Sequence, residues 1–278
     1  MTEQLVYLNG DFVPESKAKV SVFDRGFTLA DGVFETMVAK DGKIFRLKRH
    51  LERLDYGCDV LGIPCLIRED IETAIYELMC KNKLHNAVVR LTVTRGFDRE
   101  RGLNIHNPVF PTVSIRTANR TEHKAQPLSL GIASIVRNEG SPISGIKSLS
   151  YVDSVVAKNL ALKSGFDDAL ILNNAGNVTC ATSSNFFLTL EDTIFTPPVH
   201  DGILAGVTRG FVIEISSSLG LKIKETSIKP RFDKYQESFV TNVVTGVLPV
   251  VAINRVNIGS GEVGPITTAI SKMLDLER

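Results

Sequence analysis

The sequence predicts an α+β protein in which mixed sheets pack with helices, and not one doubly wound parallel sheet. Several short runs alternate apolar with polar residues, as strands do, while a few longer runs repeat apolar residues at helical spacing. The two kinds of run do not alternate strictly along the chain, as a repeated strand–helix–strand pattern requires. With 278 residues and 43% hydrophobic content, the chain can bury a large core and has the length of two ordinary domains.

In the first half of the chain, two helices are predicted between strands. Leucines recur at helical spacing over 47–61, and Gly62 is placed to end that helix. A similar periodicity predicts a second helix over 69–81. The run AVVRLTVTRG alternates as a strand, with Leu91 directed toward a core and Arg90 on the opposite face. Further strands are predicted at LVYLNGDFV, VFETMVAKDGKIF and PTVSIRT.

The polar stretch ANRTEHKAQP has few apolar residues that could anchor it in a core, so the domain boundary is predicted there. The prediction is a smaller N-terminal α+β domain over 1–117, an interdomain linker over 118–127 and a larger C-terminal α+β domain over 128–278. In the larger domain one helix is predicted over 153–164, and an amphipathic helix is predicted after GILAG. Strands are predicted at LSLGIASIVRN, ALILN, SNFFLTL, KIKETSI, ESFVTNVV and VLPVVAI.

The composition favours a small-molecule partner. The 32 basic and 31 acidic residues leave a formal net charge of +1, and no long run carries one sign of charge, so neither nucleic acid nor a membrane surface is expected as a partner. The first 20 residues lack the pattern of a secretory signal, and no run is long enough to span a bilayer, so we expect a cytoplasmic protein. The four cysteines show neither zinc-site pairing nor the density of a disulfide scaffold, so reduced thiols and no metal are predicted.

Two segments could carry chemistry on their own. In GILAGVTRG a glycine-rich turn leads into a helix, so backbone N–H groups near Val207 and Thr208 could bind an anion; an ordinary turn capped by Thr208 is the alternative. In GIKSLSY, Lys147 lies in a loop of small residues with Tyr151 four residues on. A partly desolvated lysine loses its proton more easily and can form a Schiff base with a carbonyl, but spacing alone does not distinguish it from a solvated surface lysine.

Eight segments, in the same order, resemble the fold-type IV pyridoxal-phosphate enzymes. This family includes branched-chain and D-amino-acid aminotransferases and 4-amino-4-deoxychorismate lyases. The segments are YLNGDFV, FDRGFTLADGVFET, FRLKRHLERL, VTRGFDRERGL, GIKSLSYVDSVVAKNLA, NVTCATSSNFF, DGILAGVTR and TNVVTGVLPV. The resemblance covers nearly the whole chain, and it implies the two-domain fold of the D-amino-acid aminotransferase-like enzymes with pyridoxal 5'-phosphate bound at the domain interface.

The resemblance also implies which residues hold the phosphate of the cofactor. Arg53, in HLERL, corresponds to a phosphate-binding arginine. Val207 and Thr208 correspond to the helix start that cradles the phosphate. Asn242 and Val243 correspond to further phosphate contacts; Val243 has no side-chain donor, so its backbone N–H would make the contact.

Other residues would act on the reactive part of the cofactor. By the resemblance, Lys147 holds the cofactor as a Schiff base and then moves the proton of the substrate. Tyr151 could hydrogen-bond near the phenolic oxygen of the cofactor, or it could simply pack. Cys180 stands where the family usually has a Glu that keeps the pyridine nitrogen protonated. A thiol is a weak hydrogen-bonding partner, so a weaker electron sink is expected, unless a thiolate, a neighbouring hydroxyl or water assists; packing alone is the alternative.

Three comparisons with members of the family bear on the substrate. Leu29 and Val38 stand where branched-chain aminotransferases usually carry the Tyr and Arg that serve the substrate carboxylate. D-Amino-acid aminotransferases use an Arg-x-His motif after TRG, whereas this chain has Arg101 and then Leu103. Thr36 stands where the lyases have a Thr. The resemblance therefore favours the lyases, with Arg101 and Leu29 as the substrate-binding positions.

The expected reaction converts 4-amino-4-deoxychorismate to 4-aminobenzoate and pyruvate, a step of folate biosynthesis. Lys147 would remove the ring proton, Thr36 would relay a proton and Arg101 would bind a carboxylate. The alternative is a D-amino-acid or broad-specificity aminotransferase that transfers an amino group to a 2-oxo acid. A third possibility is a protein that binds the cofactor without turnover. The resemblance also implies a homodimer in which the Arg101 segment reaches the partner.

Overall fold

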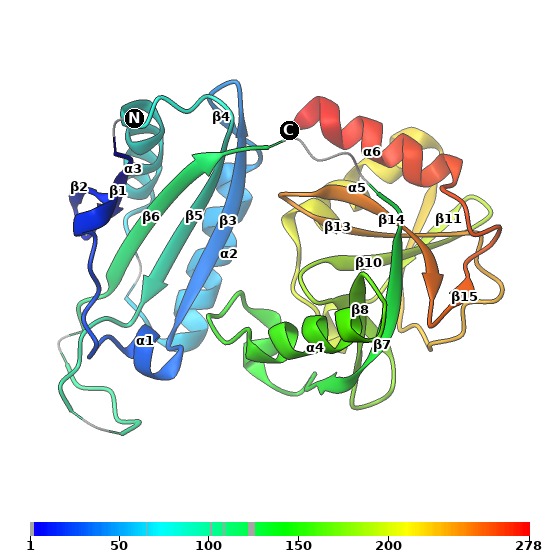
Figure 1. Cartoon of the computed structure of the whole chain (residues 1–278), viewed down its shortest axis with the longest axis horizontal. Helices are drawn as coiled ribbons and strands as arrows, with labels where there is room; N and C mark the ends of the chain where they lie inside the picture. Colours follow the sequence, from blue (N-terminus) through cyan, green and yellow to red (C-terminus); the bar gives the residue numbers. More distant parts are fainter. Residues whose placement is uncertain (1–2, 65, 101, 108, 122–125) are drawn as a thin grey trace. The chain divides into compact units, whose positions relative to one another are not determined.

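A computed structural model describes residues 3–64, 66–100, 102–107, 109–121 and 126–278. The chain forms two compact units: residues up to 122 with 146–150 and 278, and residues 123–145 with 151–277 (Figure 1). Both units mix helices and strands, which confirms the predicted α+β class. The predicted linker over 118–127 lies partly outside the described residues, and its bounds stay a prediction.

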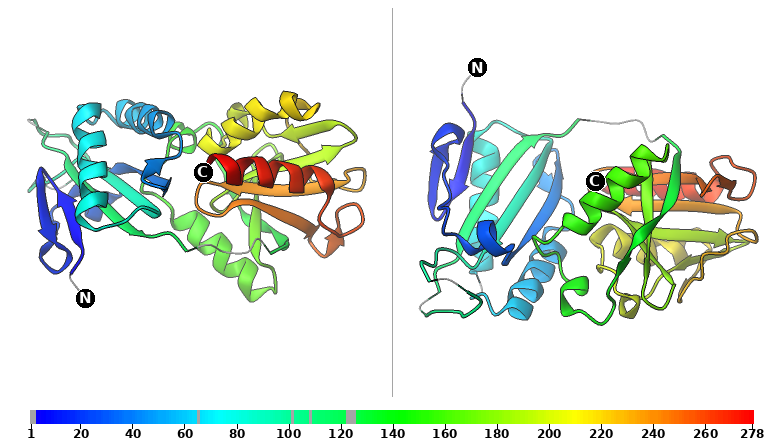
Figure 2. Two further views of the ribbon diagram at one scale, coloured as in Figure 1. Left: turned by 90° about the horizontal axis from the view of Figure 1, so that it is seen from above. Right: turned by 60° about the horizontal axis from the view of Figure 1, so that its bottom comes forward.

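The first unit is built on one antiparallel six-stranded sheet in the order β2-β1-β6-β5-β3-β4. The strands are β1 (Leu5–Leu8), β2 (Asp11–Pro14), β3 (Gly32–Lys40), β4 (Lys43–Ile44), β5 (Ala87–Thr94) and β6 (Thr112–Asn119), with a short helix η1 (Glu15–Lys17). The helices are α1 (Arg25–Leu29), α2 (Leu47–Leu61) and α3 (Arg68–Lys81), and α2 and α3 cover the same face of the sheet (Figure 2). The helices predicted over 47–61 and 69–81 are thus confirmed to within a residue.

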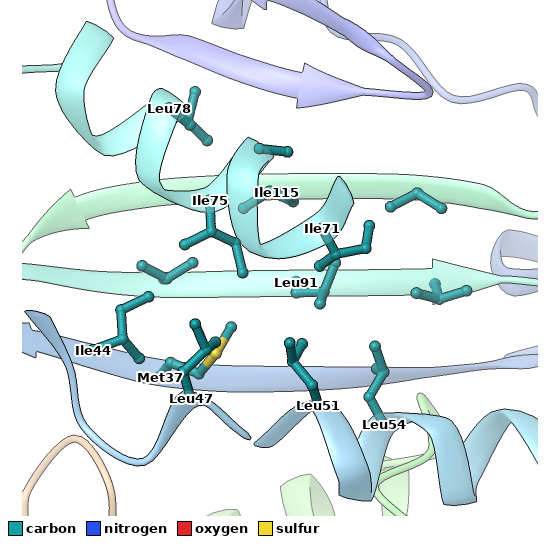
Figure 3. Close-up of a cluster of buried hydrophobic side chains, with 14 of the residues drawn as sticks. Met37, Ile44, Leu47, Leu51, Leu54, Ile71, Ile75, Leu78, Leu91 and Ile115 are labelled. Atoms are coloured by element: carbon teal, nitrogen blue, oxygen red, sulfur yellow. The ribbon is translucent and has the colours of Figure 1, made fainter. Parts of the chain in front are cut away.

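The covered face of this sheet holds a hydrophobic core (Figure 3). Leu51 and Leu54 of α2 and Ile71 and Ile75 of α3 point toward the strands, where Leu91 is fully buried. Because side chains alternate along a strand, the other face carries the intervening residues. The alternation predicted for AVVRLTVTRG is confirmed, and it separates a packed face from a face with polar side chains.

Residues 146–150 pair with β3 of the first unit. Lys147 O accepts a hydrogen bond from Phe34 N at 2.9 Å, Gly32 O accepts one from Leu149 N at 2.9 Å, and Val33 and Ser148 form an antiparallel bridge. These bonds place the backbone of Lys147 beside the strand that contains Thr36.

The second unit is a nine-stranded mixed sheet with three helices. Its strands are β7 (Leu128–Arg137), β8 (Asp168–Asn173), β9 (Val178–Ala181), β10 (Asn185–Leu190), β11 (Thr193–Thr196), β12 (Lys222–Glu225), β13 (Glu237–Asn242), β14 (Gly246–Ile253) and β15 (Val256–Asn257). The helices are α4 (Val152–Lys163), α5 (Val207–Ser216) and α6 (Pro265–Glu277), with short helices η2 (Pro142–Gly145), η3 (Val199–Asp201) and η4 (Ser217–Leu219). The order β12-β11-β10-β13-β14-β7-β8-β9 closes through one pairing of β9 with β10, between Cys180 and Asn185. Among the described residues, no helix has both the length and the apolarity to cross a membrane.

Candidate active site

Lys147 lies beside the first unit's sheet in a place that favours its neutral amine. Its Nζ is 4.3 Å from the centre of the Phe34 ring. Burial of the ammonium group lowers the pKa of Lys147 to about 8; the anion of Glu35 opposes the shift, and the cations of Arg53 and Arg90 add to it. Near neutral pH an appreciable fraction of this amine is therefore unprotonated and can act as a nucleophile or base.

Behind β3, a buried ion network fixes Arg53. Arg53 donates from Nε to Glu35 Oε1 at 2.7 Å and from Nη2 to Glu35 Oε2 at 2.8 Å, and His50 Nδ1 donates to Glu35 Oε2 at 2.7 Å. Burial alone would raise the pKa of Glu35, but the charge of Arg53 and the hydrogen bonds of His50 and Arg53 outweigh it and lower this pKa to about 2. Burial lowers the pKa of His50. Glu35 is thus an anion at neutral pH, and it orients the guanidinium of Arg53.

On the face of β3 and β5 that is turned away from α2 and α3, Arg90 contacts Phe34 and Thr36. The Arg90 guanidinium carbon lies 3.3 Å from the centre of the Phe34 ring, and Arg90 Nη1 donates to Thr36 Oγ1 at 3.4 Å. Because the Thr36 oxygen accepts from Arg90, its own proton remains available to another acceptor. Sequence reasoning placed Arg90 on this face but did not assign it to the site; the pairing of Thr36 with Arg90 across the two strands reveals it.

In the second unit, α5 begins in a setting suited to an anion. Gly206, and not Thr208, is the residue before the helix, and no side chain caps it, so the predicted alternative of a Thr208 cap is wrong. A Cβ at Gly206 would lie 1.9 Å from Asn185 Oδ1, so a larger residue there would displace the Asn185 side chain, which donates to Leu204 O. Val207 and Thr208 are buried, and Thr208 Oγ1 has no hydrogen-bond partner within the described residues. A buried hydroxyl and the first N–H groups of a helix are groups that bind an anion.

Asn242 shapes the turn between β13 and β14 that follows. Its Oδ1 accepts from Val244 N at 2.9 Å and from Thr245 N at 2.8 Å, and its Nδ2 donates to Ser184 Oγ at 2.9 Å. The buried Thr245 Oγ1 also has no partner among the described residues. Asn242 is therefore engaged in holding the turn, while Val243 carries only backbone groups that could meet an anion.

Cys180 lies beside a fixed cation. It is 8% exposed, and Arg137 Nη1 donates to its Sγ at 3.8 Å. The same guanidinium donates from Nη2 to Ser144 O at 2.7 Å and from Nε to Gly202 O at 2.5 Å. Two backbone carbonyls thus hold Arg137 against the thiol, an arrangement that the sequence did not indicate because 43 residues separate the two side chains.

The remaining predicted site residues are less informative. Tyr151 precedes α4, and its carbonyl accepts from Val155 N. Leu29 ends α1 and is 45% exposed. Arg101 lies outside the described residues. Lys147, Arg53 and Thr36 all lie in the first unit near β3, but Arg53 pairs with Glu35 on one face of the strand and Thr36 meets Arg90 on the other. Tyr151, Cys180, Val207, Thr208, Asn242 and Val243 lie in the second unit. The roles of all these residues stay predictions.

Comparison with known proteins identifies the family. A family model described as "Amino-transferase class IV" matches residues 32–253. The chain belongs to the class IV aminotransferase family. The match confirms the family that the sequence resembles and confirms that the protein is an enzyme. Members of this family depend on pyridoxal phosphate, so the predicted cofactor is confirmed at the level of the family.

Individual relatives carry names for different reactions. A Methanocaldococcus jannaschii protein assigned by name to the branched-chain amino-acid aminotransferases is 34% identical over 96% of this chain and 94% of its own. D-alanine aminotransferase of Staphylococcus haemolyticus is 31% identical over 96% and 95%. The T.th. branched-chain amino acid aminotransferase, solved with pyridoxamine 5'-phosphate, matches at TM-score 0.91 and 27% identity over 99% and 93%. A Legionella pneumophila structure described as a 4-amino-4-deoxychorismate lyase matches at TM-score 0.88 and 26% identity, over 95% of this chain and 97% of its own.

Proposed function

We propose that this enzyme is an aminodeoxychorismate lyase that converts 4-amino-4-deoxychorismate to 4-aminobenzoate and pyruvate in folate biosynthesis. The class IV family membership supports an enzyme of the aminotransferase or lyase type. The observation that carries the choice of lyase is the pairing of Cys180 with Arg137, where the family usually has a carboxylate.

The residues fit pyridoxal 5'-phosphate. Lys147 would hold the aldehyde, and Arg53 and the start of α5 at Val207–Thr208 would hold the phosphate, together with Val243 N–H. The unpartnered buried hydroxyl of Thr208 at the start of α5, where no side chain caps the helix, supports the phosphate assignment. Asn242 shapes the neighbouring turn, and Tyr151 is proposed near the ring. When bound, the cofactor supplies a carbonyl for covalent attachment and a conjugated ring that delocalises electrons from the bond being broken.

Lys147 is the proposed base. The lowered pKa of its amine means that it can accept a substrate proton near neutral pH and return it later. Thr36, whose oxygen accepts from Arg90, can donate its proton to the substrate and so act as the relay. Arg101 is proposed to bind a carboxylate, and Leu29 to contact the substrate.

Cys180 and Arg137 favour a reaction that needs little help from ring protonation. A carboxylate would stabilise a protonated pyridine nitrogen, whereas sulfur is a weaker hydrogen-bonding partner and here has the positive charge of Arg137 beside it, which would oppose a second positive charge on the ring. In the lyase reaction, formation of the aromatic product itself favours elimination. An aminotransferase has no comparable driving force, so it depends more on the ring as an electron sink.

The direct test is an assay of the purified enzyme, loaded with cofactor, on 4-amino-4-deoxychorismate. Equal amounts of 4-aminobenzoate and pyruvate are expected, and Lys147→Arg is expected to abolish both. Absence of 4-aminobenzoate, with formation of pyruvate from D-alanine and 2-oxoglutarate, would refute the lyase and establish the alternative.

The second candidate is a D-amino-acid or broad-specificity aminotransferase. It is favoured by the names of the relatives, which at 31–34% identity are aminotransferases. The third possibility is a protein that binds the cofactor without turnover. The same assay distinguishes it, because such a protein would convert neither 4-amino-4-deoxychorismate nor D-alanine with 2-oxoglutarate. The retention of Lys147, Arg53 and Thr208 weighs against that outcome.

We also propose that the enzyme is a cytoplasmic homodimer. Large apolar side chains are exposed near α1 and in the segment that follows β5: Phe23, Phe27, Phe97, Leu103 and Phe110. An exposed apolar surface of this kind is typical of a protein–protein interface. Light scattering coupled to size exclusion is expected to give twice the mass of 30.4 kDa, and a monomer would refute the proposal.

A further inference from the structure

His50 is a buried titratable side chain that the proposed reaction does not use. It lies on α2, and its side chain has no exposed surface. Its Nδ1 lies 2.7 Å from Glu35 Oε2, and because a carboxylate only accepts, this nitrogen carries the proton. In the neutral ring, Nε2 is then an acceptor, and it is buried without a partner within the described residues. The bond to Glu35 is therefore the polar contact that explains a histidine at this position.

Glu35 links His50 to Arg53. Its Oε2 accepts from both side chains, and its Oε1 accepts from Arg53 Nε at 2.7 Å. A carboxylate can rotate about the last bond of a glutamate side chain, because that torsion has only a weak preference. The additional donor from His50 fixes its plane. Because a guanidinium meets a carboxylate edge to edge through paired N–H groups, the plane of Arg53 follows that of Glu35.

Of these three side chains, Arg53 alone reaches the surface. It is 12% exposed, whereas Glu35 and His50 are fully buried. Arg53 turns the edge formed by Nε and Nη2 toward Glu35, so its Nη1 end is directed away from that carboxylate. An anion from solvent can thus meet Arg53 but not His50. Any effect of His50 on such an anion must pass through Glu35 and Arg53.

We propose that His50 is a positioning residue, which holds Glu35 so that Arg53 is already oriented for the cofactor phosphate before the cofactor binds. The inference rests on the proposed function in taking Arg53 as a phosphate-binding residue. An arginine that is not held in place must lose side-chain freedom when the phosphate arrives, and this loss weakens binding. Removing the donor of His50 should therefore affect the phosphate and not the rest of the cofactor.

The test compares the binding of pyridoxal 5'-phosphate and of pyridoxal by equilibrium dialysis. Pyridoxal has the same ring and aldehyde but no phosphate, so the ratio of the two affinities reports on the phosphate site. His50→Leu is expected to weaken binding of the phosphate form about tenfold and to change pyridoxal binding less than about twofold. His50→Asn keeps an N–H donor near the place of Nδ1, so its loss should stay below about threefold.

Two further variants calibrate the ratio. Ile75→Val removes a methyl group from a fully buried side chain on α3, so it loosens the core without changing a donor to Glu35. It should leave the ratio unchanged. Arg53→Gln removes the guanidinium itself, and it should lower the ratio at least as far as His50→Leu does. Thermal melting establishes that each variant is folded, and His50→Met, which also lacks the donor, takes the place of His50→Leu if that variant does not fold.

The outcomes separate the positioning role from the assignments on which it rests. If folded His50→Leu keeps the wild-type ratio while Arg53→Gln lowers it, the role of His50 is refuted and the phosphate assignment of Arg53 stands. If Arg53→Gln also keeps the ratio, both are refuted. An enzyme that forms no 4-aminobenzoate, but in which His50→Leu weakens only the phosphate form, refutes the lyase and supports the positioning role.

Discussion

Replacing Glu35 with glutamine removes a negative charge from a fully buried position and keeps the shape of the side chain. Arg53 and His50, which donate to this carboxylate, would lose their charged partner. The pKa of Glu35 falls from its ordinary 4.5 to about 2. At about 1.4 kcal/mol for each factor of ten in proton affinity, this corresponds to roughly 3 kcal/mol of folding stability at neutral pH.

The pH dependence of this contribution has a definite sign. Because the folded-state pKa of Glu35 is below 4.5, the stabilisation is fully present above that pH and is lost as the pH falls toward about 2. Urea unfolding followed by circular dichroism is therefore expected to show Glu35→Gln less stable than wild type by about 3 kcal/mol at pH 7. The difference should narrow as the pH falls below 4.5.

A control separates this network from ordinary surface charge. Glu52→Gln removes a carboxylate that pairs with the exposed Arg49, and it should change the stability by less than about 0.5 kcal/mol. Burial also lowers the pKa of His50 from its ordinary 6.5, so the need to protonate His50 destabilises the folded state below that pH. His50 is present both in wild type and in Glu35→Gln. Equal stabilities of wild type and Glu35→Gln at pH 7, or a difference that stays constant down to pH 3, would refute the reasoning.

Three further outcomes follow from the site. In cofactor-free protein, labelling of Lys147 by an amine-reactive reagent should rise with pH around a midpoint near 8, with Lys147→Arg as the unlabelled control; a midpoint near 10.5 would mean that the amine is not desolvated. Thr208→Val removes an unpartnered buried hydroxyl, so equilibrium dialysis should show cofactor affinity weakened about tenfold, and an unchanged affinity would exclude this hydroxyl from the phosphate site. Cys180→Glu should change the cofactor absorption spectrum and raise the ratio of aminotransfer to elimination; if spectrum, turnover and ratio are all unchanged, Cys180 only packs.

Features set by neighbouring residues could be predicted from the sequence. The helices over 47–61 and 69–81 were predicted because apolar side chains repeat within a single element, and the alternation around Arg90 follows from the geometry of one strand. The start of α5 was predicted from its glycines, and the alternative of a Thr208 cap is wrong because Gly206 is the residue before the helix.

Contacts between distant segments could not be predicted. Glu35 meets Arg53 only because α2 packs on β3, and Arg137 meets Cys180 only because β7, β8 and β9 are neighbours in the sheet. Each contact depends on strand order and register, for which the residues themselves give no local signal. The resemblance named Arg53 and Cys180 but not the partners that fix them.

The hydrogen bonds between residues 146–150 and β3 have a consequence for how this enzyme could change its substrate. The backbone of Lys147 is joined by hydrogen bonds to the strand that carries Phe34 and Thr36, so the point from which its side chain extends is fixed by strand pairing. The side chains of β5 contribute nothing to these bonds, so a residue such as Arg90 can be exchanged while the backbone of the lysine keeps its place. The strands beside the proposed reacting group can thus accept single replacements without rebuilding the backbone that carries it.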